Sequence, residues 1–199
     1  QLIRIIDDLI DFAKLEANQI RVDQENVNLN RLMDQLYGFF LNALASQEKS
    51  SVTLLASKSL PDPESVIRSD DTRLSQVFSH LLDNACKFTS DGYIEFGYKI
   101  KKDKVEFFVK DSGIGIARDK HELVFEQFRQ GDEGHTRKYG GTGLGLPIAK
   151  GMVNLLGGNI WFESEKDKGS TFYFTIPYVT ELKKEKSGVD RSETGNIYD

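Results

Sequence analysis

The sequence predicts an α+β fold, a two-layer α/β sandwich with three helices on one face of a mixed, mostly antiparallel sheet of about five strands. Two observations support this prediction. Three long stretches carry apolar residues at helical spacing over several turns. Short runs rich in β-branched and aromatic residues lie between and after them, and several come in pairs separated by turn residues, a pattern typical of β-hairpins.

A further helix is predicted over residues 1–19, because apolar side chains repeat there at heptad spacing. The repeating residues are Leu2, Ile5, Leu9 and Phe12. The apolar face starts at the first residue without a capping signal, and it needs a partner. We interpret this helix as part of a longer helical hairpin; the alternative is that it simply docks on the domain that follows. Residues 20–28 are polar and are predicted to form a linker.

The other helices and strands are predicted from the spacing of apolar residues, from turn residues and from helix-capping residues. Helices are expected over residues 29–46, from Asp70 or Asp71 to about Phe88, and over 144–156; strands are expected over 52–56, 66–68, 93–100, 104–110, 159–164 and 170–177. Residues 130–143 are polar and rich in glycine, which predicts a mobile flap. Residues 181–199 are charged and predict a tail or the start of a linker.

Composition limits the possible functions. Hydrophobic residues make up 39% and charged residues 29% of the chain, which is ordinary for a soluble globular protein. The net charge of -5 argues against a nucleic-acid binder, and no apolar run is long enough to span a bilayer. The single cysteine, Cys86, excludes an internal disulfide, and its place in a helical pattern predicts a buried apolar role.

One helix carries polar residues that suit a ligand. Its apolar stripe runs along one face, and the opposite face presents Arg73, His80, Asn84 and Lys87. An asparagine offers a neutral oxygen that suits Mg²⁺, and a lysine one turn further could neutralise phosphate charge. Periodicity alone leaves both a solvated surface and a ligand-binding face open.

Two glycine-rich motifs follow. In DSGIGI, Asp111 ends a strand and can accept a hydrogen bond from an exocyclic amine, although an ordinary tight loop explains the motif equally well. GGTGLGLP opens a helix, whose first backbone N–H groups can bind an anion. The spacing does not fit a Rossmann fold, because Leu146 occupies the position of the last glycine, and the chain has no Gly-Lys pair for a Walker A loop.

Four motifs, HLLDNACKFT, DSGIGI, FEQF and GGTGLGLP, occur in one order, and as an ordered set they resemble the catalytic ATP-binding domain of sensor histidine kinases. That family shares the Bergerat ATP-binding fold with type II topoisomerases, Hsp90 and MutL-like repair proteins. The match covers about residues 20–178. IIDDLIDFAKLEA resembles the end of the second helix of the family's dimerisation and phosphoacceptor hairpin.

The resemblance implies ATP and Mg²⁺ as cofactors. It makes Asn84 the Mg²⁺ ligand, Lys87 a phosphate contact and Asp111 the selector of adenine. The other residues that it assigns to nucleotide binding are Gly113, Gly115, Ile116, Phe128, Arg129, Gly141, Thr142, Gly143, Leu144, Gly145 and Thr171. It also implies that Phe125 and Phe128 anchor a flexible lid, from which Arg129, Gln130, Arg137 and Lys138 are further candidates for phosphate contacts.

The chain departs from the family pattern at two places. His80 stands where the family has an asparagine, so we assign it to the catalytic group with Asn84 and Lys87, as a weak general base or a contact to a bound water. The family's acceptor histidine lies in the first hairpin helix, which would precede residue 1. We therefore expect the chain to bind ATP without phosphorylating itself, and we do not assign His121 or His135 as acceptors.

The resemblance predicts a protein-histidine kinase that transfers the γ-phosphoryl of ATP to a histidine on the hairpin, for relay to a response-regulator receiver domain. An ATP-driven conformational switch and a degenerate nucleotide-binding module remain the alternatives. We expect residues 1–19 to be hairpin, 20–28 linker, 29–180 catalytic domain and 181–199 tail. The full-length protein is expected to be a homodimer anchored in the inner membrane. This part should be cytoplasmic, without nucleic-acid or direct membrane contact.

Overall fold

The protein is described by a computed structural model that covers residues 2–47, 49–126 and 142–180. Its helices are α1 (Leu2–Glu16), α2 (Leu29–Ser46), α3 (Asp71–Phe88) and α5 (Gly145–Leu155), with short 3₁₀ helices at Asp62–Glu64 and Arg118–Leu123. Its strands are β1 (Glu25–Asn28), β2 (Val52–Ser57), β3 (Val66–Ser69), β4 (Gly92–Lys101), β5 (Lys104–Asp111), β6 (Asn159–Glu165) and β7 (Gly169–Pro177).

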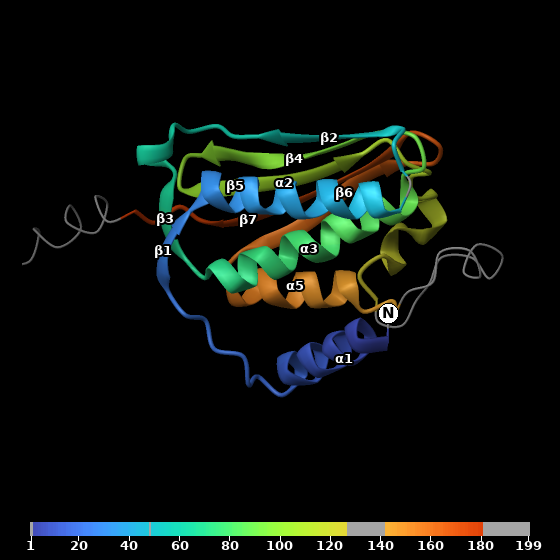
Figure 1. Ribbon diagram of the computed structural model, residues 1–199. Coiled ribbons are helices and arrows are strands. Elements are labelled where there is room, and N and C mark those ends of the chain that lie inside the picture. The colour runs from blue at the N-terminus through green and yellow to red at the C-terminus, as the bar shows by residue number, and fades with distance from the viewer. Residues whose placement is uncertain (1, 48, 127–141, 181–199) are drawn as a thin grey trace, which may run out of the picture.

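The main sheet has five strands in the order β2-β4-β5-β7-β6. β2 pairs with β4 in parallel, and the other neighbours are antiparallel. Figure 1 shows α2, α3 and α5 as a layer on one face of this sheet. The predicted two-layer α+β fold with a mixed, mostly antiparallel sheet is confirmed.

A second, two-stranded sheet was not predicted. β1 pairs antiparallel with β3, so part of the stretch expected to be a linker is a strand. The sequence of β1, ENVN, has no alternation of apolar residues that would indicate a strand. Its pairing depends on β3, which is far away in the sequence, and a local pattern cannot show such a partner.

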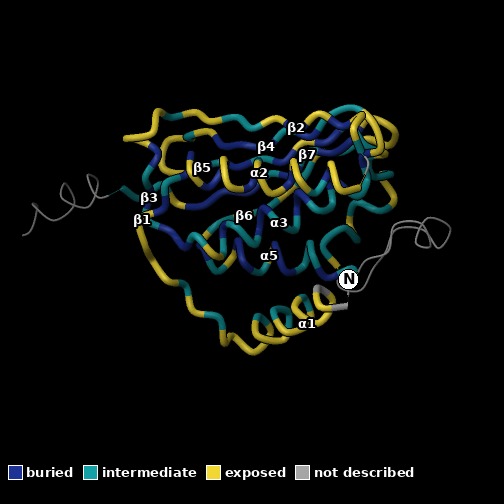
Figure 2. The backbone as a smooth tube through the Cα atoms, viewed as in Figure 1, coloured by how far each residue is buried: buried dark blue, intermediate teal, exposed yellow. Residues whose placement is uncertain are grey.

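Phe78 on α3 lies at the centre of the core. Its ring meets those of Phe96, Phe107 and Phe174 edge-on, at centroid distances of 6.1, 5.5 and 5.2 Å. These three residues come from β4, β5 and β7, so a single helix side chain contacts three strands. In Figure 2 the buried residues, in dark blue, lie on the strands of the main sheet and on the helices that cover it. Edge-to-face contacts of this kind add about 1 kcal/mol each to the burial of the rings.

Both ends of α3 are fixed by side chains. At the start, the Asp70 carboxylate accepts hydrogen bonds from the backbone N–H of Arg73 and of Asp23, each at 2.9 Å. At the end, the Lys49 ammonium donates to the carbonyl oxygens of Cys86 and Thr89. An acidic group at the start and a cation at the end both complement the helix dipole. α3 is therefore a rigid support for the polar side chains that it carries.

Helix α1 lies outside this layer, against α5 and away from the sheet (Figure 1). Phe12 and Leu15 pack toward the core, while the other side exposes large apolar residues. The exposed residues are Ile3, Ile5, Ile6, Leu9 and Ile10. The helix thus docks on the domain and also keeps an uncovered apolar face. No helix in the described ranges is both long and apolar enough to cross a membrane.

Candidate functional site

The loop that follows β5 lies directly on the C-terminal end of α3. The backbone N–H of Ile114 donates to the carbonyl oxygen of Phe88 at 3.3 Å. A Cβ added to Gly113 would lie only 2.4 Å from the same oxygen, so no other residue fits there without movement. We call residues 111–116 the first glycine loop.

The start of α5 lies on the middle of α3. A Cβ added to Gly145 would come within 3.3 Å of Nδ1 of His80. We call residues 142–145, which lead into α5, the second glycine loop. His80, Asn84 and Lys87 follow one another at spacings of four and three residues, so they share one face of α3.

Asn84 and Lys87 are half-buried, and along α3 they come between the points where the second and the first glycine loop contact the helix. The two contacts on α3, at His80 and at Phe88, are eight residues apart, which corresponds to about 12 Å along the helix. Burial lowers the pKa of Lys87, and its ammonium lies 4.7 Å from the ring centroid of Phe88. A cation that has lost part of its hydration gains more from an anionic ligand than an exposed one does.

Asp111 is 7% exposed and is held by the backbone. Its Oδ1 accepts from the N–H of Gly113 at 2.9 Å, and the backbone N–H of Ser170 also donates to the carboxylate. Burial raises the pKa of Asp111, and these two hydrogen bonds oppose that rise only in part. A buried, oriented carboxylate suits the recognition of a neutral donor such as an exocyclic amine.

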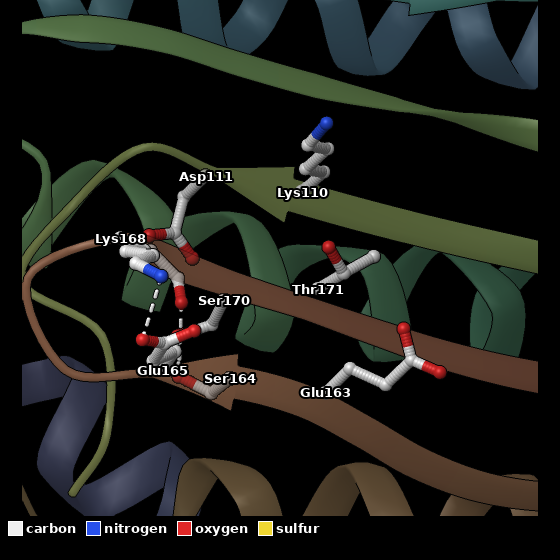
Figure 3. Close-up of a pocket in the computed structure, with 9 residues that line it drawn as sticks. Lys110, Asp111, Glu163, Ser164, Glu165, Lys168, Ser170 and Thr171 are labelled. Carbon is white, nitrogen blue, oxygen red and sulfur yellow. Dashed lines mark hydrogen bonds and ion pairs between the residues drawn. The ribbon is translucent and has the colours of Figure 1, made fainter.

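The family motif assigns Thr171 to nucleotide binding, and the sheet register does not place it opposite Asp111. Asp111 pairs with Ser170, whereas Thr171 pairs with Lys110. The side chains of Lys110 and Asp111 leave β5 in opposite directions (Figure 3). Ser170 is therefore the neighbour of Asp111 on the helix-covered face. The period of two along β7 could have shown this, because Phe172 and Phe174 point into the core.

The first glycine loop is also tied to the β6–β7 hairpin. The backbone N–H of Ile116 donates to Oγ of Ser164 at 2.8 Å, and that hydroxyl lies 2.9 Å from Oγ of Ser170. Gly115 has a φ of 63°, and a Cβ added there would lie 2.0 Å from the carbonyl oxygen of Glu165. The loop is thus held on one side by α3 and on the other by two strands.

The second glycine loop leads into the start of α5. Gly143 has a φ of 70°, in the region that favours glycine. In the described structure no side chain caps the first turn of α5, although its first N–H groups lack partners within the helix. The Leu144 N–H donates to Oγ1 of Thr142 at 3.1 Å. An uncapped helix start after a glycine turn is suited to bind an anion.

A pocket of about 310 Å³ lies at the ends of β5, β6 and β7 (Figure 3). Asp111, Ser164 and Ser170 line it together with Lys110, Glu163 and Thr171 from the uncovered face of the sheet. Asn84 and Lys87 do not line it. The pocket therefore shares Asp111 with the first glycine loop but does not extend to Asn84 and Lys87 on α3.

Several predicted residues lie outside the described ranges. These are Phe128, Arg129, Gln130, His135, Arg137, Lys138 and Gly141. Phe125 is described, and its ring meets those of Phe162 and Phe172 at 5.9 and 6.4 Å. His121 also packs edge-on against Phe162, and one ring nitrogen lies 3.1 Å from the carbonyl oxygen of Ile116. These contacts fix the segment that leads toward residue 127.

A divalent cation beside Asn84 would depend on its ligand for most of its oxygens. Within the part of the chain that the structure describes, no group of three or more His, Cys, Asp or Glu residues could hold a metal ion. One amide oxygen together with phosphate oxygens and water is a donor set that suits Mg²⁺. The residues present thus fit a cation that arrives with a phosphate ligand.

The site combines a supporting helix, a buried aspartate at a strand end, and a helix start that follows a glycine turn and has no side-chain cap in the described ranges. This is the arrangement of a nucleotide-binding domain that uses neither a P-loop nor a Rossmann fold. Comparison with known families agrees. The family described as histidine kinase-, DNA gyrase B-, and HSP90-like ATPase matches residues 69–180, from the start of α3 to the end of β7. The chain belongs to this family.

Individual relatives are sensor kinases. The chain is 33% identical over 184 residues to the sensor histidine kinase WalK of Bacillus subtilis. The match covers 91% of this chain and 29% of WalK. Among solved structures, full-length ShkA in complex with AMPPNP superimposes with a TM-score of 0.76 at 29% identity, over 90% of this chain and 36% of ShkA. The histidine kinase ThkA in complex with the response regulator TrrA gives a TM-score of 0.69 at 25% identity, over 89% and 47%. The chain spans less than a third of the length of WalK.

Proposed function

We propose that this chain is the ATP-binding catalytic domain of a sensor histidine kinase, joined to part of the helical hairpin that such kinases use for dimerisation. It binds Mg-ATP between α3 and the two glycine loops. The γ-phosphoryl group passes to a histidine on the first helix of that hairpin, and from there to an aspartate of a response regulator. The similarity to WalK supports the kinase class, and the AMPPNP complex of ShkA supports the nucleotide.

The observation that carries this proposal is that α3 contacts both glycine loops, near His80 and near Phe88. Asn84 and Lys87 lie between these contacts. A nucleoside triphosphate needs a base recognised at one end and charge neutralised along the other. Asp111 and Ser170 supply hydrogen-bonding groups at the first loop, and Lys87 with the start of α5 supplies positive potential.

Mg²⁺ would be held by the amide oxygen of Asn84 and by the phosphates. When bound, the ion supplies charge neutralisation on the phosphoryl oxygens. Asn84 would orient the phosphates, and Lys87 would donate a hydrogen bond to a phosphate oxygen. The first glycine loop positions the base, so the reacting phosphoryl group points toward the second glycine loop.

We assign His80 a position beside the start of α5 and a weak catalytic role at most. Its ring contacts the place where a side chain on Gly145 would lie. His80→Ala should lower any slow ATP hydrolysis without changing the Mg²⁺ dependence of binding. Unchanged hydrolysis in this variant would remove His80 from the catalytic group.

The exposed apolar face of α1 supports the assignment to the hairpin. Ile3, Leu9 and Ile10 are exposed on a helix whose other side is docked. In the whole protein this face would pack within a homodimer. Because its relatives are sensor kinases, we place the domain on the cytoplasmic side of a membrane-anchored protein. The complex of ThkA with TrrA supports a receiver domain as the partner that accepts the phosphoryl group.

Calorimetry with Mg-ADP tests the nucleotide site. The unmodified chain should bind, and Asn84→Ala should lose the Mg²⁺-dependent part of the affinity. Asn42→Ala is the matched control, because Asn42 is an exposed asparagine on α2, far from both loops in the sequence. No binding of Mg-ADP by the unmodified chain would exclude the proposal.

Transfer to a separately supplied hairpin tests the reaction. Labelled phosphate from ATP should appear on the hairpin histidine and not on this chain alone. Hydrolysis without transfer would instead favour an ATP-driven conformational switch. Binding without either reaction would favour a degenerate module.

A further inference from the structure

Helix α1 reaches the second glycine loop through an acidic side chain. Oγ1 of Thr142 donates a hydrogen bond to Oδ2 of Asp8 at 3.0 Å. The two residues are separated by 134 positions in the sequence, and Asp8 is half-buried. The contact therefore joins the proposed hairpin helix to the proposed phosphate-binding segment.

Two more contacts fix the same side of α1. Oδ2 of Asp11 accepts from Nε2 of Gln76 on α3 at 3.0 Å. Leu15 packs over Gly151 on α5, where an added Cβ would lie 3.0 Å from its side chain. Asp8, Asp11 and Leu15 follow at spacings of three and four residues, so they share one face. This face docks α1 across both α3 and α5 in one register.

The contact changes what the second glycine loop offers to a ligand. Oγ1 of Thr142 accepts from the backbone N–H of Leu144 while it donates to Asp8. One N–H group near the helix start is therefore satisfied within the protein. A carboxylate also lies at a place where a phosphate would bring further negative charge. Both effects oppose the binding of an anion at the start of α5.

We propose that the docking of α1 and the binding of nucleotide phosphates compete for the second glycine loop, with Asp8 as the residue that couples them. This inference rests on the proposed nucleotide site. Phosphates bind after Thr142 releases Asp8, and the release loosens α1 from the domain. Because linkage is reciprocal, a docked α1 weakens phosphate binding by the same factor by which bound phosphates weaken docking.

Removal of the carboxylate tests the competition. Asp8→Ala should bind ADP about fivefold or more tightly than the unmodified chain, the lower end of common coupling energies. Its affinity for adenosine should stay the same, because adenosine reaches Asp111 but has no phosphate. A general loss of packing would instead change both affinities. Asp7→Ala is the matched control, since Asp7 is a neighbouring exposed carboxylate on α1 and its removal alters the net charge equally.

Hydrogen exchange gives a second measurement. Saturating ADP should speed exchange of the backbone amides of residues 2–16, whereas adenosine should not. An ADP affinity that is unchanged or weaker in Asp8→Ala would overturn the proposal. A rate of hydrogen exchange in α1 that does not change when ADP is added would also overturn it. If the unmodified chain bound neither ADP nor adenosine, the proposed function itself would fail. Failure of the competition alone would look different, because the unmodified chain and Asp8→Ala would then bind ADP with equal affinity.

Discussion

The two glycine loops meet the same helix but are held in different ways. The first, residues 111–116, is fixed by backbone groups of its own domain, because Gly113 lies on the Phe88 carbonyl and Gly115 on the Glu165 carbonyl. The second, residues 142–145, is held by the side chain of Thr142 and, through it, by Asp8 of another helix. Because the backbone of the first loop packs so closely that no side chain fits at its glycines, this loop is held in one conformation. A hydroxyl that bonds to a separate helix can be exchanged for a ligand.

This difference suits the two ends of a nucleotide. Recognition of a base requires fixed donors and acceptors, which the first loop provides through Asp111 and Ser170. Phosphate binding coupled to a moving helix requires a loop that can rearrange. Changes in the first loop should therefore act mainly on stability and base recognition, and changes in the second mainly on phosphate affinity.

The largest expected effect comes from Gly115→Ala. The new Cβ would lie 2.0 Å from the Glu165 carbonyl oxygen, at a φ of 63° that disfavours alanine. Strain and steric overlap together should lower the free energy of unfolding by about 3 kcal/mol or more, measured by urea denaturation.

Gly38→Ala is the matched control for that change. Gly38 lies in α2 with nothing within 4 Å of an added Cβ. This variant should gain up to about 1 kcal/mol from helix propensity. Equal stability of the two variants would contradict the view that backbone contacts fix the first loop.

Asp111→Asn should separate binding from stability. The amide can still accept from Gly113 but presents N–H donors to the amine of adenine, so adenosine and ADP should both bind about 10- to 100-fold more weakly. Burial raises the pKa of Asp111, which means that the charged carboxylate is unfavourable in the folded state. The free energy of unfolding near neutral pH should change little, because the neutral amide avoids this cost but keeps only one acceptor oxygen for the N–H groups of Gly113 and Ser170. Weaker binding of ADP with unchanged binding of adenosine would assign Asp111 to the phosphate end instead.

The sequence predicted the layers of the fold, since three helical stripes and several hairpins carry strong local periodicity. It also put Asn84 and Lys87 on one face of α3, although the roles assigned to them stay predictions. The family motif assigns Thr171 to nucleotide binding, and this role stays a prediction. The alternation of the strand places Ser170, and not Thr171, on the same face as Asp111. The contact between Asp8 and Thr142 could not be predicted, because no local pattern relates residues that far apart.

Gly143→Ala tests the second loop in the same way as Gly115→Ala tests the first. Its φ of 70° should cost about 1–2 kcal/mol when alanine occupies the position. Because the hydrogen bonds described for this loop run through the Thr142 hydroxyl, the strain should be relieved by local rearrangement rather than by unfolding. ADP affinity should fall about tenfold, while adenosine affinity and the urea midpoint should change little. A loss of stability as large as that of Gly115→Ala would show that both loops are equally fixed.

The smallest expected effect is the pH dependence of ADP affinity that arises from Lys87 on α3. Burial lowers the pKa of Lys87 below its usual value of 10.5, and bound phosphate should raise it again because the charged form is then stabilised. Binding of ADP above the pKa of the free protein therefore takes up a proton, and its affinity should fall as pH rises, by less than tenfold per pH unit. Lys87→Arg should remove this decline below pH 10, because an arginine stays charged there. The affinity for adenosine should not follow pH in either protein, and calorimetry in buffers of different ionisation enthalpy would measure the proton uptake directly. An identical decline in Lys87→Arg would assign the titration to another group and remove Lys87 from the phosphate contacts.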